Sequence, residues 1–359
     1  MLFLPSIPKL DTTAMQRAAA RQNTLTKPNG SLGRLESLAI GLAGMQGYEG
    51  PQIHLPYIIV IAGDHGITRQ GVSAYPAEVT PQMVLNYLRG GAAVNVLARH
   101  AGAQMIVADF GVAVDMPAYP ALVSQKIAYG TRDFSVEPAM TEAQAEQAIA
   151  QGISLANRAI DEGADLIVLG DMGIGNTTAS AAMIAALTGK PAADVTGRGT
   201  GVDNVTWKRK VALIEQALIT YQLHLPPYDL HSGTENIPFG LNLLRHVGGF
   251  EIGGLCGVVL GAASRRVPVL VDGVITGAAA LLATMLVTNA RYYLIAAHLS
   301  VEPGHRAALA HLGLTPLLDL ELRLGEGSGA ALAIPLVVAA CKVLNEMATF
   351  SEAGVSNNG

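Results

Sequence analysis

The sequence of 359 residues is poor in cysteine, in aromatic side chains and in charge. Its two cysteines, Cys256 and Cys341, lie far apart in apolar surroundings and form no CxxC pair. This spacing argues against a disulfide framework and against a cysteine-based metal site. The net charge of -5 leaves no excess of lysine and arginine. Nucleic acid and anionic lipid are therefore not expected as partners, because both require clustered cations.

Targeting and membrane signals are also lacking. The first residues, MLFLPSIPKLDTTAMQ, contain two prolines and no basic stretch or cleavage site, which argues against a signal peptide and predicts a cytoplasmic protein. The segment Gly273 to Ala290 carries no charge over the length of a membrane span. Because it contains Thr276, Thr284 and Asn289, we predict a buried crossover helix there and no membrane span.

What the sequence has in quantity is aliphatic residues, since half of it is hydrophobic while 5% is aromatic. Short apolar runs predict strands covered on both faces, and they begin at Tyr57, Ala103, Asp165, Val267 and Tyr292. Helical patterns lie between them, at Pro81 to His100, at Thr141 to Asp161 with a capping box of Thr141 and Gln144, and from Asn176, Val205, Glu251 and Gly273. This alternation predicts an α/β protein with a parallel sheet.

The two chain ends differ from the middle, because they contain helical patterns without strands. We expect residues 1–50 and 301–359 to form a small helical domain and residues 51–300 to form the large α/β domain. A loop near 324–329 would return to the cleft of the large domain. Ligands of parallel sheets bind at the carboxyl ends of the strands, where Asp64, Asp109, Asp171, Asp272 and His298 stand in this sequence.

The stretch GDMGIGNTTAS, residues 170–180, stands where a strand gives way to a helix. Backbone amides and hydroxyls there suit a phosphate, and GRGTG with Lys208, Arg209 and Lys210 follows downstream. The stretch matches neither a dinucleotide fingerprint nor a Walker A loop. A tight turn with ordinary helix caps remains the alternative.

Two further segments allow more than one interpretation. The loop GVSAYPAEVTPQMV places Ser73, Tyr75, Gln82 and Met83 where a flat apolar ligand could bind, or it is a surface loop with a helix cap at Thr80. The pairs Asp64–His65 and Glu302–His305 contain metal-ligand types, but no HExxH spacing occurs and we expect no metal.

Glu326 stands between two glycines just ahead of a long apolar run. Burial of this carboxylate would raise its pKa and make it an effective proton acceptor near neutral pH. Alternatively, Glu326 caps the helix that follows.

Together these motifs resemble one family over most of the chain, from about Pro5 to Glu346. KPNGSLGRLE, GDHGI, GVSAYP, GGAAVNVLAR, GDMGIGNTTAS, GRGTG, GGFEIGGLCG, SVEPGH and LRLGEGSGAALAIPLV are similar, in order, to segments of the nicotinate-nucleotide:dimethylbenzimidazole phosphoribosyltransferases. The resemblance implies a Rossmann-like α/β domain with helices on both faces, a small helical domain formed by both chain ends, and a homodimer. It implies no cofactor.

The reaction implied is transfer of the 5-phosphoribosyl group of nicotinate mononucleotide to 5,6-dimethylbenzimidazole in cobalamin biosynthesis, with Glu326 as the general base. The implied benzimidazole pocket consists of Ser73, Tyr75, Gln82, Met83, Asp171 and Leu324. The implied phosphate and ribose site consists of Gly173, Gly175, Asn176, Thr177, Lys210, Gly273 and Ser300. The family usually has glutamate at position 171. Asp171 is shorter by one methylene group, so we expect its direct hydrogen bond to the benzimidazole to be lost or to pass through a water molecule. A non-catalytic sensor of benzimidazoles or ribotides and a metal-dependent hydrolase are the alternatives, and the preferred azole is left open.

Overall fold

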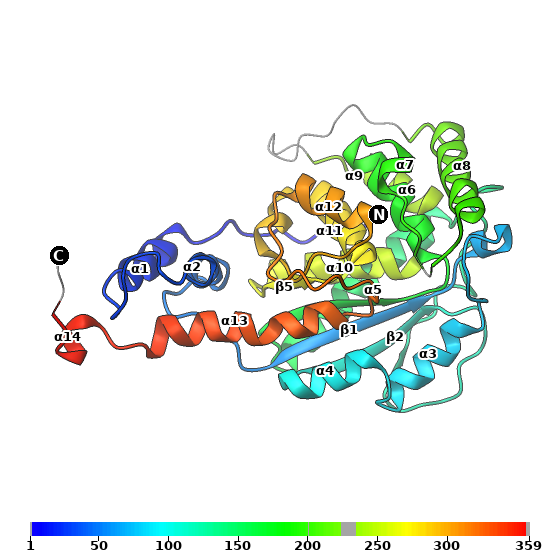
Figure 1. The fold of residues 1–359 in the computed structure, drawn as a ribbon. Helices are drawn as coiled ribbons and strands as arrows, with labels where there is room; N and C mark the ends of the chain where they lie inside the picture. The colour runs from blue at the N-terminus through cyan, green and yellow to red at the C-terminus, as the bar shows by residue number, and fades with distance from the viewer. Residues whose placement is uncertain (1, 200, 224–234, 357–359) are drawn as a thin grey trace.

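The computed structural model describes residues 2–199, 201–223 and 235–356. Within them, six parallel strands form one sheet in the order β3-β2-β1-β4-β5-β6 (Figure 1). Their bounds are β1 Pro56–Gly63, β2 Gln104–Gly111, β3 Leu122–Ser124, β4 Leu166–Met172, β5 Val269–Val271 and β6 Leu294–Ala296. This is the strand order of doubly wound nucleotide-binding folds, and it confirms the predicted Rossmann-like class.

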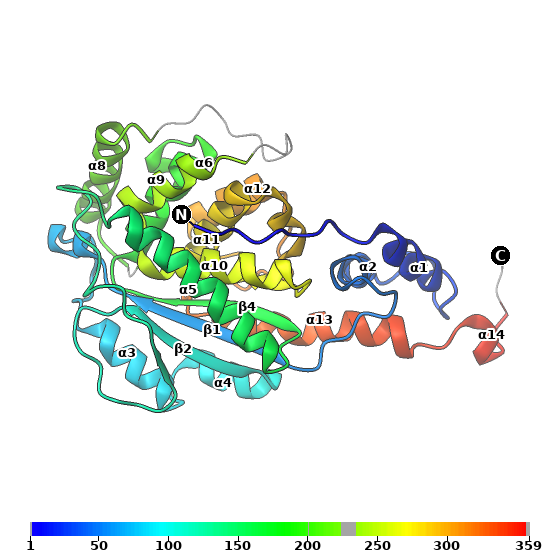
Figure 2. The same ribbon diagram turned by 180° about the vertical axis from the view of Figure 1, so that it is seen from behind.

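Helices cover both faces of the sheet (Figures 1 and 2). One face carries α5 (Glu142–Asp161), α10 (Phe250–Ser264) and α11 (Val274–Leu286), and the other carries α3 (Val79–Leu88), α4 (Ala93–Ala101) and α13 (Ser328–Glu346). Helices α6 (Asn176–Thr188), α9 (Ile237–Val247) and α12 (Pro303–Leu312) pack against α11, and α7 (Ala192–Val195) and α8 (Asn204–Thr220) pack against α6. Two 3-10 helices are η1 (Gly66–Gln70) and η3 (Thr288–Tyr293).

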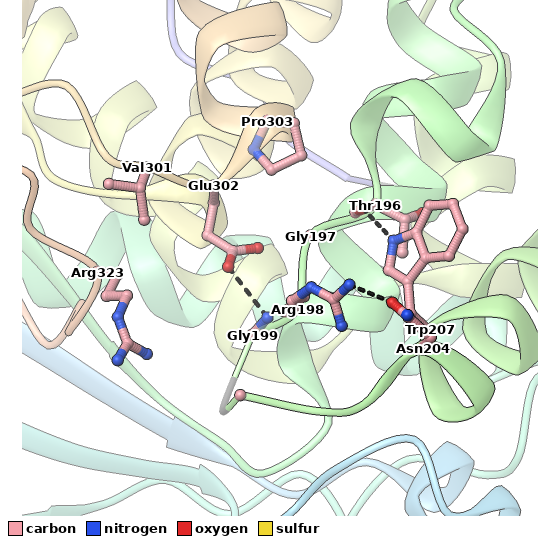
Figure 3. A pocket seen from close by; sticks show the side chains of 11 residues that line it. Thr196, Gly197, Arg198, Gly199, Asn204, Trp207, Val301, Glu302, Pro303 and Arg323 are labelled. Atoms are coloured by element: carbon pink, nitrogen blue, oxygen red, sulfur yellow. Dashed lines mark hydrogen bonds between the residues drawn. The ribbon is translucent and has the colours of Figure 1, made fainter.

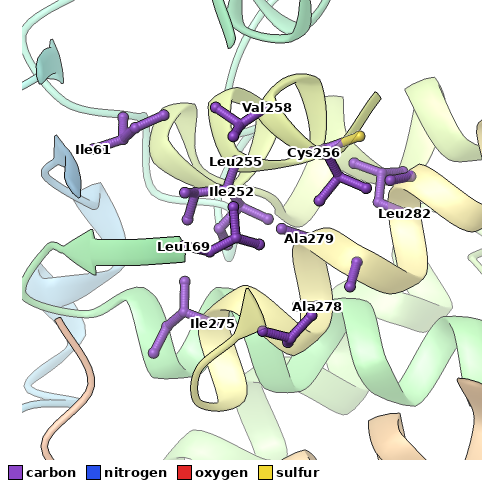
Figure 4. Packing of buried hydrophobic residues seen from close by; sticks show 14 of the residues in the cluster. Ile61, Leu169, Ile252, Leu255, Cys256, Val258, Ile275, Ala278, Ala279 and Leu282 are labelled. Carbon is purple, nitrogen blue, oxygen red and sulfur yellow. The ribbon is translucent and has the colours of Figure 1, made fainter. Parts of the chain in front are cut away.

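The main core lies between the sheet and α10 and α11. Every residue of β1 and of β4 is buried, as expected for strands covered on both faces. Figure 4 shows how aliphatic side chains of the strands, such as Ile61 and Leu169, meet those of the two helices. Cys256 lies in this core, and Cys341 is buried in α13. Burial raises the pKa of the Cys341 thiol to about 12.

The contact between α5 and α10 depends on glycine. A Cβ atom at Gly152 would stand 1.9 Å from the carbonyl oxygen of Gly254, and one at Gly257 would stand 2.0 Å from that of Ile149. The two helix backbones therefore touch, with no room for a methyl group between them.

The end of the molecule remote from α8 contains α1 (Thr12–Gln22), α2 (Arg34–Gln46), the far half of α13 and α14 (Phe350–Ala353) (Figure 1). A second, smaller core holds α1, α2 and α13 together, and it consists of Ala18, Ala39, Ala43, Ala340 and Leu344. Ahead of α1 the chain runs extended back across the body (Figure 2). It is held there by hydrogen bonds from Asn289 to the carbonyl of Ile7 and from Tyr293 to that of Pro8.

Most predicted elements are confirmed, including α5 with its reciprocal capping box of Thr141 and Gln144. The single helix expected at Pro81 to His100 is wrong. The chain leaves α3 after Leu88 and begins α4 at Ala93, because Gly90 adopts a left-handed conformation with φ of 77°. The short edge strand β3 was not predicted, since none of its residues is buried.

Two apolar segments bear on the membrane prediction. The buried crossover helix expected after Gly273 is confirmed as α11, in which every residue is buried. Among the described residues, α13 is long and apolar enough to cross a membrane, with 56% of its most apolar window buried. It packs against α2, α4 and the sheet, as a core helix does.

Candidate active site

A cavity of about 490 Å³ opens at the carboxyl end of β4, in the part of the sheet where the strand order reverses. Ligands of doubly wound folds bind at this switch point. Ten of the predicted site residues line it, namely Tyr75, Met83, Asp171, Gly173, Asn176, Thr177, Gly273, Ser300, Leu324 and Glu326. The structure thus brings together segments that are distant in the sequence.

Glu326 reaches this cavity from a strained turn. Gly325, Glu326 and Gly327 all adopt positive φ angles, of 80°, 65° and 89°. This conformation costs a non-glycine residue about 1 to 2 kcal/mol, so the surrounding structure must hold it in place. Helix α13 begins only at Ser328, and its N-cap is Gly327, which makes no side-chain bond. The interpretation of Glu326 as the cap of this helix is therefore wrong.

The Glu326 side chain is buried, with the residue 8% exposed. Burial raises the pKa of its carboxyl group to about 6. The hydroxyl of Tyr87, on α3, opposes this shift, while the negative charge of Asp272 adds to it. A carboxyl group with this pKa is largely ionised at neutral pH and still binds a proton readily, which suits a general base.

Asp171 lies in β4, beside the same cavity, and is 5% exposed. Its Oδ2 accepts a hydrogen bond of 2.9 Å from the side-chain amide Nδ2 of Asn176, while its Oδ1 has no partner within the described residues. Burial, reinforced by the charges of Asp272, Glu251 and Glu326, holds the pKa of Asp171 well above its usual range. Its surroundings therefore favour the protonated form of this carboxyl group more than solvent would.

The turn before α6 forms another wall of the cavity. Gly175, the N-cap of α6, has φ of 96° and does not itself line the cavity. A Cβ atom at Gly173 would stand 2.1 Å from the carbonyl oxygen of Gly63, so this turn packs directly on the end of β1. The amides of the first turn of α6 and the hydroxyl of Thr177 suit an anion.

Lys210 lies behind Thr177 and does not line the cavity. Its Nζ donates a hydrogen bond of 3.1 Å to Thr177 Oγ1, and the residue is 1% exposed. Burial lowers the pKa of Lys210 to about 8, although the nearby Glu302 carboxylate opposes the shift.

Only part of the segment from Ser73 to Met83 lines the cavity. Tyr75 and Met83 line the cavity, whereas Ser73 and Gln82 do not. Ser73 Oγ accepts a bond from the amide of Tyr75, and Gln82 is exposed on α3. Thr80 is not a helix cap. Its hydroxyl accepts a bond of 3.1 Å from the amide of Ile174, which ties α3 to the turn before α6.

Two of the strand-end carboxylates expected at the site lie elsewhere. Asp64 accepts a bond from the amide of Ala113, and Asp109 accepts one from Val112 and pairs with Lys126, so both brace nearby loops. Asp272 and His298 are buried just behind Glu326.

A second cavity, of about 570 Å³, adjoins the first and shares Gly199, Glu302 and Arg323 with it (Figure 3). In this cavity Glu302 Oε1 accepts a hydrogen bond of 3.0 Å from the amide of Gly199. The sequence had suggested Glu302 only as a metal-ligand type, and it gave no role to Arg323 or Tyr87. Within the described residues, no group of three or more His, Cys, Asp or Glu side chains is arranged to hold a metal ion.

Comparisons with known proteins identify the family to which this chain belongs. A family model described as phosphoribosyltransferase matches residues 7–355. The chain is 60% identical over 347 residues to the nicotinate-nucleotide–dimethylbenzimidazole phosphoribosyltransferase of Chloroflexus aggregans, covering 97% of this chain and 95% of that protein. It is 59% identical over 348 residues to the protein of the same name from Roseiflexus sp., with the same coverage of 97% and 95%.

Among solved structures, the fold is similar to that of CobT from Thermus thermophilus. The TM-score is 0.89 at 46% identity, and the match covers 96% of this chain and 100% of that one.

Proposed function

This chain belongs to the phosphoribosyltransferase family, and from that premise we propose that it transfers the 5-phosphoribosyl group of nicotinate mononucleotide to 5,6-dimethylbenzimidazole. The products are α-ribazole 5'-phosphate and nicotinate, in a step of cobalamin biosynthesis. The observation that carries the proposal is a buried Glu326 carboxyl group in a cavity that also contains the N-terminus of α6. The family and the named relatives favour this enzyme over a non-catalytic sensor.

Glu326 acts as the general base. When one nitrogen of the benzimidazole attacks the anomeric carbon of the ribose, the other nitrogen becomes acidic, and the carboxylate removes its proton. The bond from the anomeric carbon to the pyridinium nitrogen breaks at the same time, and its electron pair leaves with the nicotinate ring. Attack from the face opposite the β-linked nicotinate gives the α product, which requires both rings to be held in line.

The apolar wall of the cavity receives the benzimidazole. Tyr75 and Leu324 are each 56% exposed at its mouth, which leaves two apolar surfaces for a flat ring to cover. Met83 forms the wall beside them. Ser73 and Gln82 complete this pocket in the proposal by moving toward the bound ring. Asp171, when protonated, donates a hydrogen bond to a substrate oxygen or nitrogen.

The opposite wall receives the ribose phosphate. The backbone amides from Gly173 to Thr177 bind the phosphate, with Gly273 and Ser300 facing it across the cavity. Gly175 sets the turn, and Lys210 supplies positive charge through Thr177.

A direct assay tests the proposal. The purified protein is incubated with nicotinate mononucleotide and 5,6-dimethylbenzimidazole, and α-ribazole 5'-phosphate is measured by chromatography. Glu326→Gln should fold normally and lose about 100-fold or more in kcat, as loss of a general base does. Glu215→Gln, an exposed position on α8, is the matched control. Absence of product from the unmodified protein would refute the reaction, and full activity of Glu326→Gln would refute only the assigned base.

The proposal extends to assembly and location. We propose a homodimer in the cytoplasm, in which residues 1–50 and 301–359 form the small helical domain and residues 51–300 the large one. The separate core of α1, α2 and α13 supports this division, while the packing of α12 on α6 and α11 favours a boundary closer to α13. Light scattering should give twice the mass of one chain. A single-chain mass would contradict the dimer.

A further inference from the structure

The loop that carries Glu326 lies on the backbone of β4. A Cβ atom at Gly170 would stand 2.5 Å from the carbonyl oxygen of Glu326. One at Gly327 would stand 3.3 Å from the carbonyl oxygen of Leu169. The loop therefore cannot move toward the sheet, and β4 limits its position from one side.

Asp272, just after β5, holds the same loop from a second direction. It is 0% exposed, its Oδ2 accepts a hydrogen bond of 3.1 Å from the amide of Gly327, and its Oδ1 accepts one of 2.7 Å from the amide of Ala330. These amides belong to the first turn of α13 and its N-cap, where backbone donors have no partner within the helix. Asp272 thus caps α13 from another element, and the bond to Gly327 fixes the residue next to Glu326.

His298, just after β6, holds Asp272 in turn. Its Nε2 lies 3.4 Å from Asp272 Oδ1, and a Cβ atom at Gly329 would stand 2.1 Å from its Cδ2. The imidazole therefore packs on the first turn of α13 while it faces the carboxylate. Burial opposes a positive charge on His298, but Asp272 outweighs this effect and the pKa of His298 is raised.

We propose that Asp272 is a positioning residue for the reaction, holding the Glu326 loop against the cavity through the amides of Gly327 and Ala330, with His298 holding Asp272. Neither residue lines the cavity, so both act through the loop. This inference rests on the proposed function, because it gives Asp272 a part in placing the general base.

Asp272 also has an electrostatic effect that a merely structural residue would lack. The titratable groups around the loop are Tyr87 from α3, Asp171 from β4 and Asp272 with His298 from the strand ends, and His305 from α12 lies beyond His298. The negative charge of Asp272 raises the pKa of Glu326. Removal of this charge should lower that pKa, so that Glu326 stays ionised to a lower pH.

The test compares Asp272→Asn with the unmodified enzyme over a range of pH. The variant keeps one oxygen as acceptor and loses the charge, so kcat should fall about tenfold or more while KM for both substrates changes less than about twofold. The acid limb of kcat/KM should move to lower pH. Asp109→Asn is the matched control, because Asp109 is a buried strand-end carboxylate that accepts the backbone amide of Val112 and does not line the cavity. It should keep the unmodified kcat and acid limb.

The outcomes separate this inference from the function on which it rests. If Asp272→Asn keeps kcat and the acid limb of the unmodified enzyme, the positioning role is refuted and the reaction stands. If Glu326→Gln is fully active, Glu326 is not the general base, and the positioning role of Asp272 is refuted with it. If Asp272→Asn does not fold, the same kinetic measurements are made on His298→Gln. A fall of about threefold or more in kcat at unchanged KM supports the proposal, and unchanged kcat overturns it.

Discussion

Two regions of this protein bring backbone against backbone through glycine, and they differ in what the contact achieves. Where α5 crosses α10, Gly152 and Gly257 admit carbonyl oxygens of the facing helix, and the surroundings are apolar. At the active site, Gly170 admits the carbonyl of Glu326, and the surroundings are ionisable. The first contact holds two layers together, whereas the second fixes the place of a proton acceptor. Stability and catalysis should therefore be separable by adding single methyl groups.

The largest effect is expected at the helix crossing. Gly257→Ala places a methyl group 2.0 Å from the carbonyl oxygen of Ile149, and the two helices must separate to admit it. We expect the free energy of unfolding to fall by about 3 kcal/mol, as for severe overpacking of a core. Denaturant unfolding measures this loss. The kcat of the folded fraction should be unchanged, and a large fall in kcat would show that the two regions are coupled.

At the active-site contact the same substitution should act mainly on the rate. Gly170→Ala pushes the carbonyl of Glu326 away from β4 and so displaces the carboxyl group. We expect kcat to fall about tenfold, equivalent to about 1.4 kcal/mol in the activation free energy, with KM nearly unchanged. Steady-state kinetics with both substrates checks this. If the variant loses stability but keeps its kcat, the contact at Gly170 stabilises the fold, as the contact between α5 and α10 does, and does not position Glu326.

The ionisable surroundings of the second region predict a pH dependence. Because Glu326 must be ionised to accept a proton and its pKa is about 6, kcat/KM should be constant well above pH 6. Below that pH it should fall about tenfold per unit. Rates measured from about pH 4.5 to about pH 8.5 would show this limb. A limb near the ordinary glutamate pKa of about 4.3 would mean that the carboxyl group is solvated in the working enzyme.

The smallest effect is expected where a glycine has no neighbour. Gly41 lies inside α2, and a Cβ atom there would meet nothing within 4 Å. Gly41→Ala should raise the free energy of unfolding by about 0.5 to 1 kcal/mol, because alanine loses less backbone entropy in a helix. Thermal unfolding tests this. A destabilised variant would indicate that a second subunit contacts this position.

The sequence predicted the sheet and most helices because their signals are local. Runs such as YIIVIAG are short and apolar at every position, as a strand covered on both faces requires, and Thr141 with Gln144 marks a helix start within four residues. The break between α3 and α4 was missed since apolar periodicity continues across Gly90, where only the backbone conformation changes. Strand β3 has no such pattern because it lies at the exposed edge of the sheet.

The sequence predicted those site residues that stand in a recognisable local motif. It did not predict the residues that reach the site only through contacts between distant segments. Glu326 stood out as a lone carboxylate between glycines, and its burial and raised pKa follow from that setting. Nothing local connects Tyr87 or Asp272 with it, because these groups meet it only after the strands have paired. Lys210 was expected at the phosphate site, but its place behind Thr177 depends on a contact between α8 and α6 that no local pattern shows.

The burial of both thiols makes the protein a convenient starting point for labelling. Cys256 and Cys341 lie in apolar packing that keeps them protonated and inaccessible, so thiol reagents should leave the native chain unmodified. One cysteine introduced at Leu324, on the rim of the cavity, could then carry the sole fluorophore. Its emission would report when an aromatic substrate enters and when the product departs.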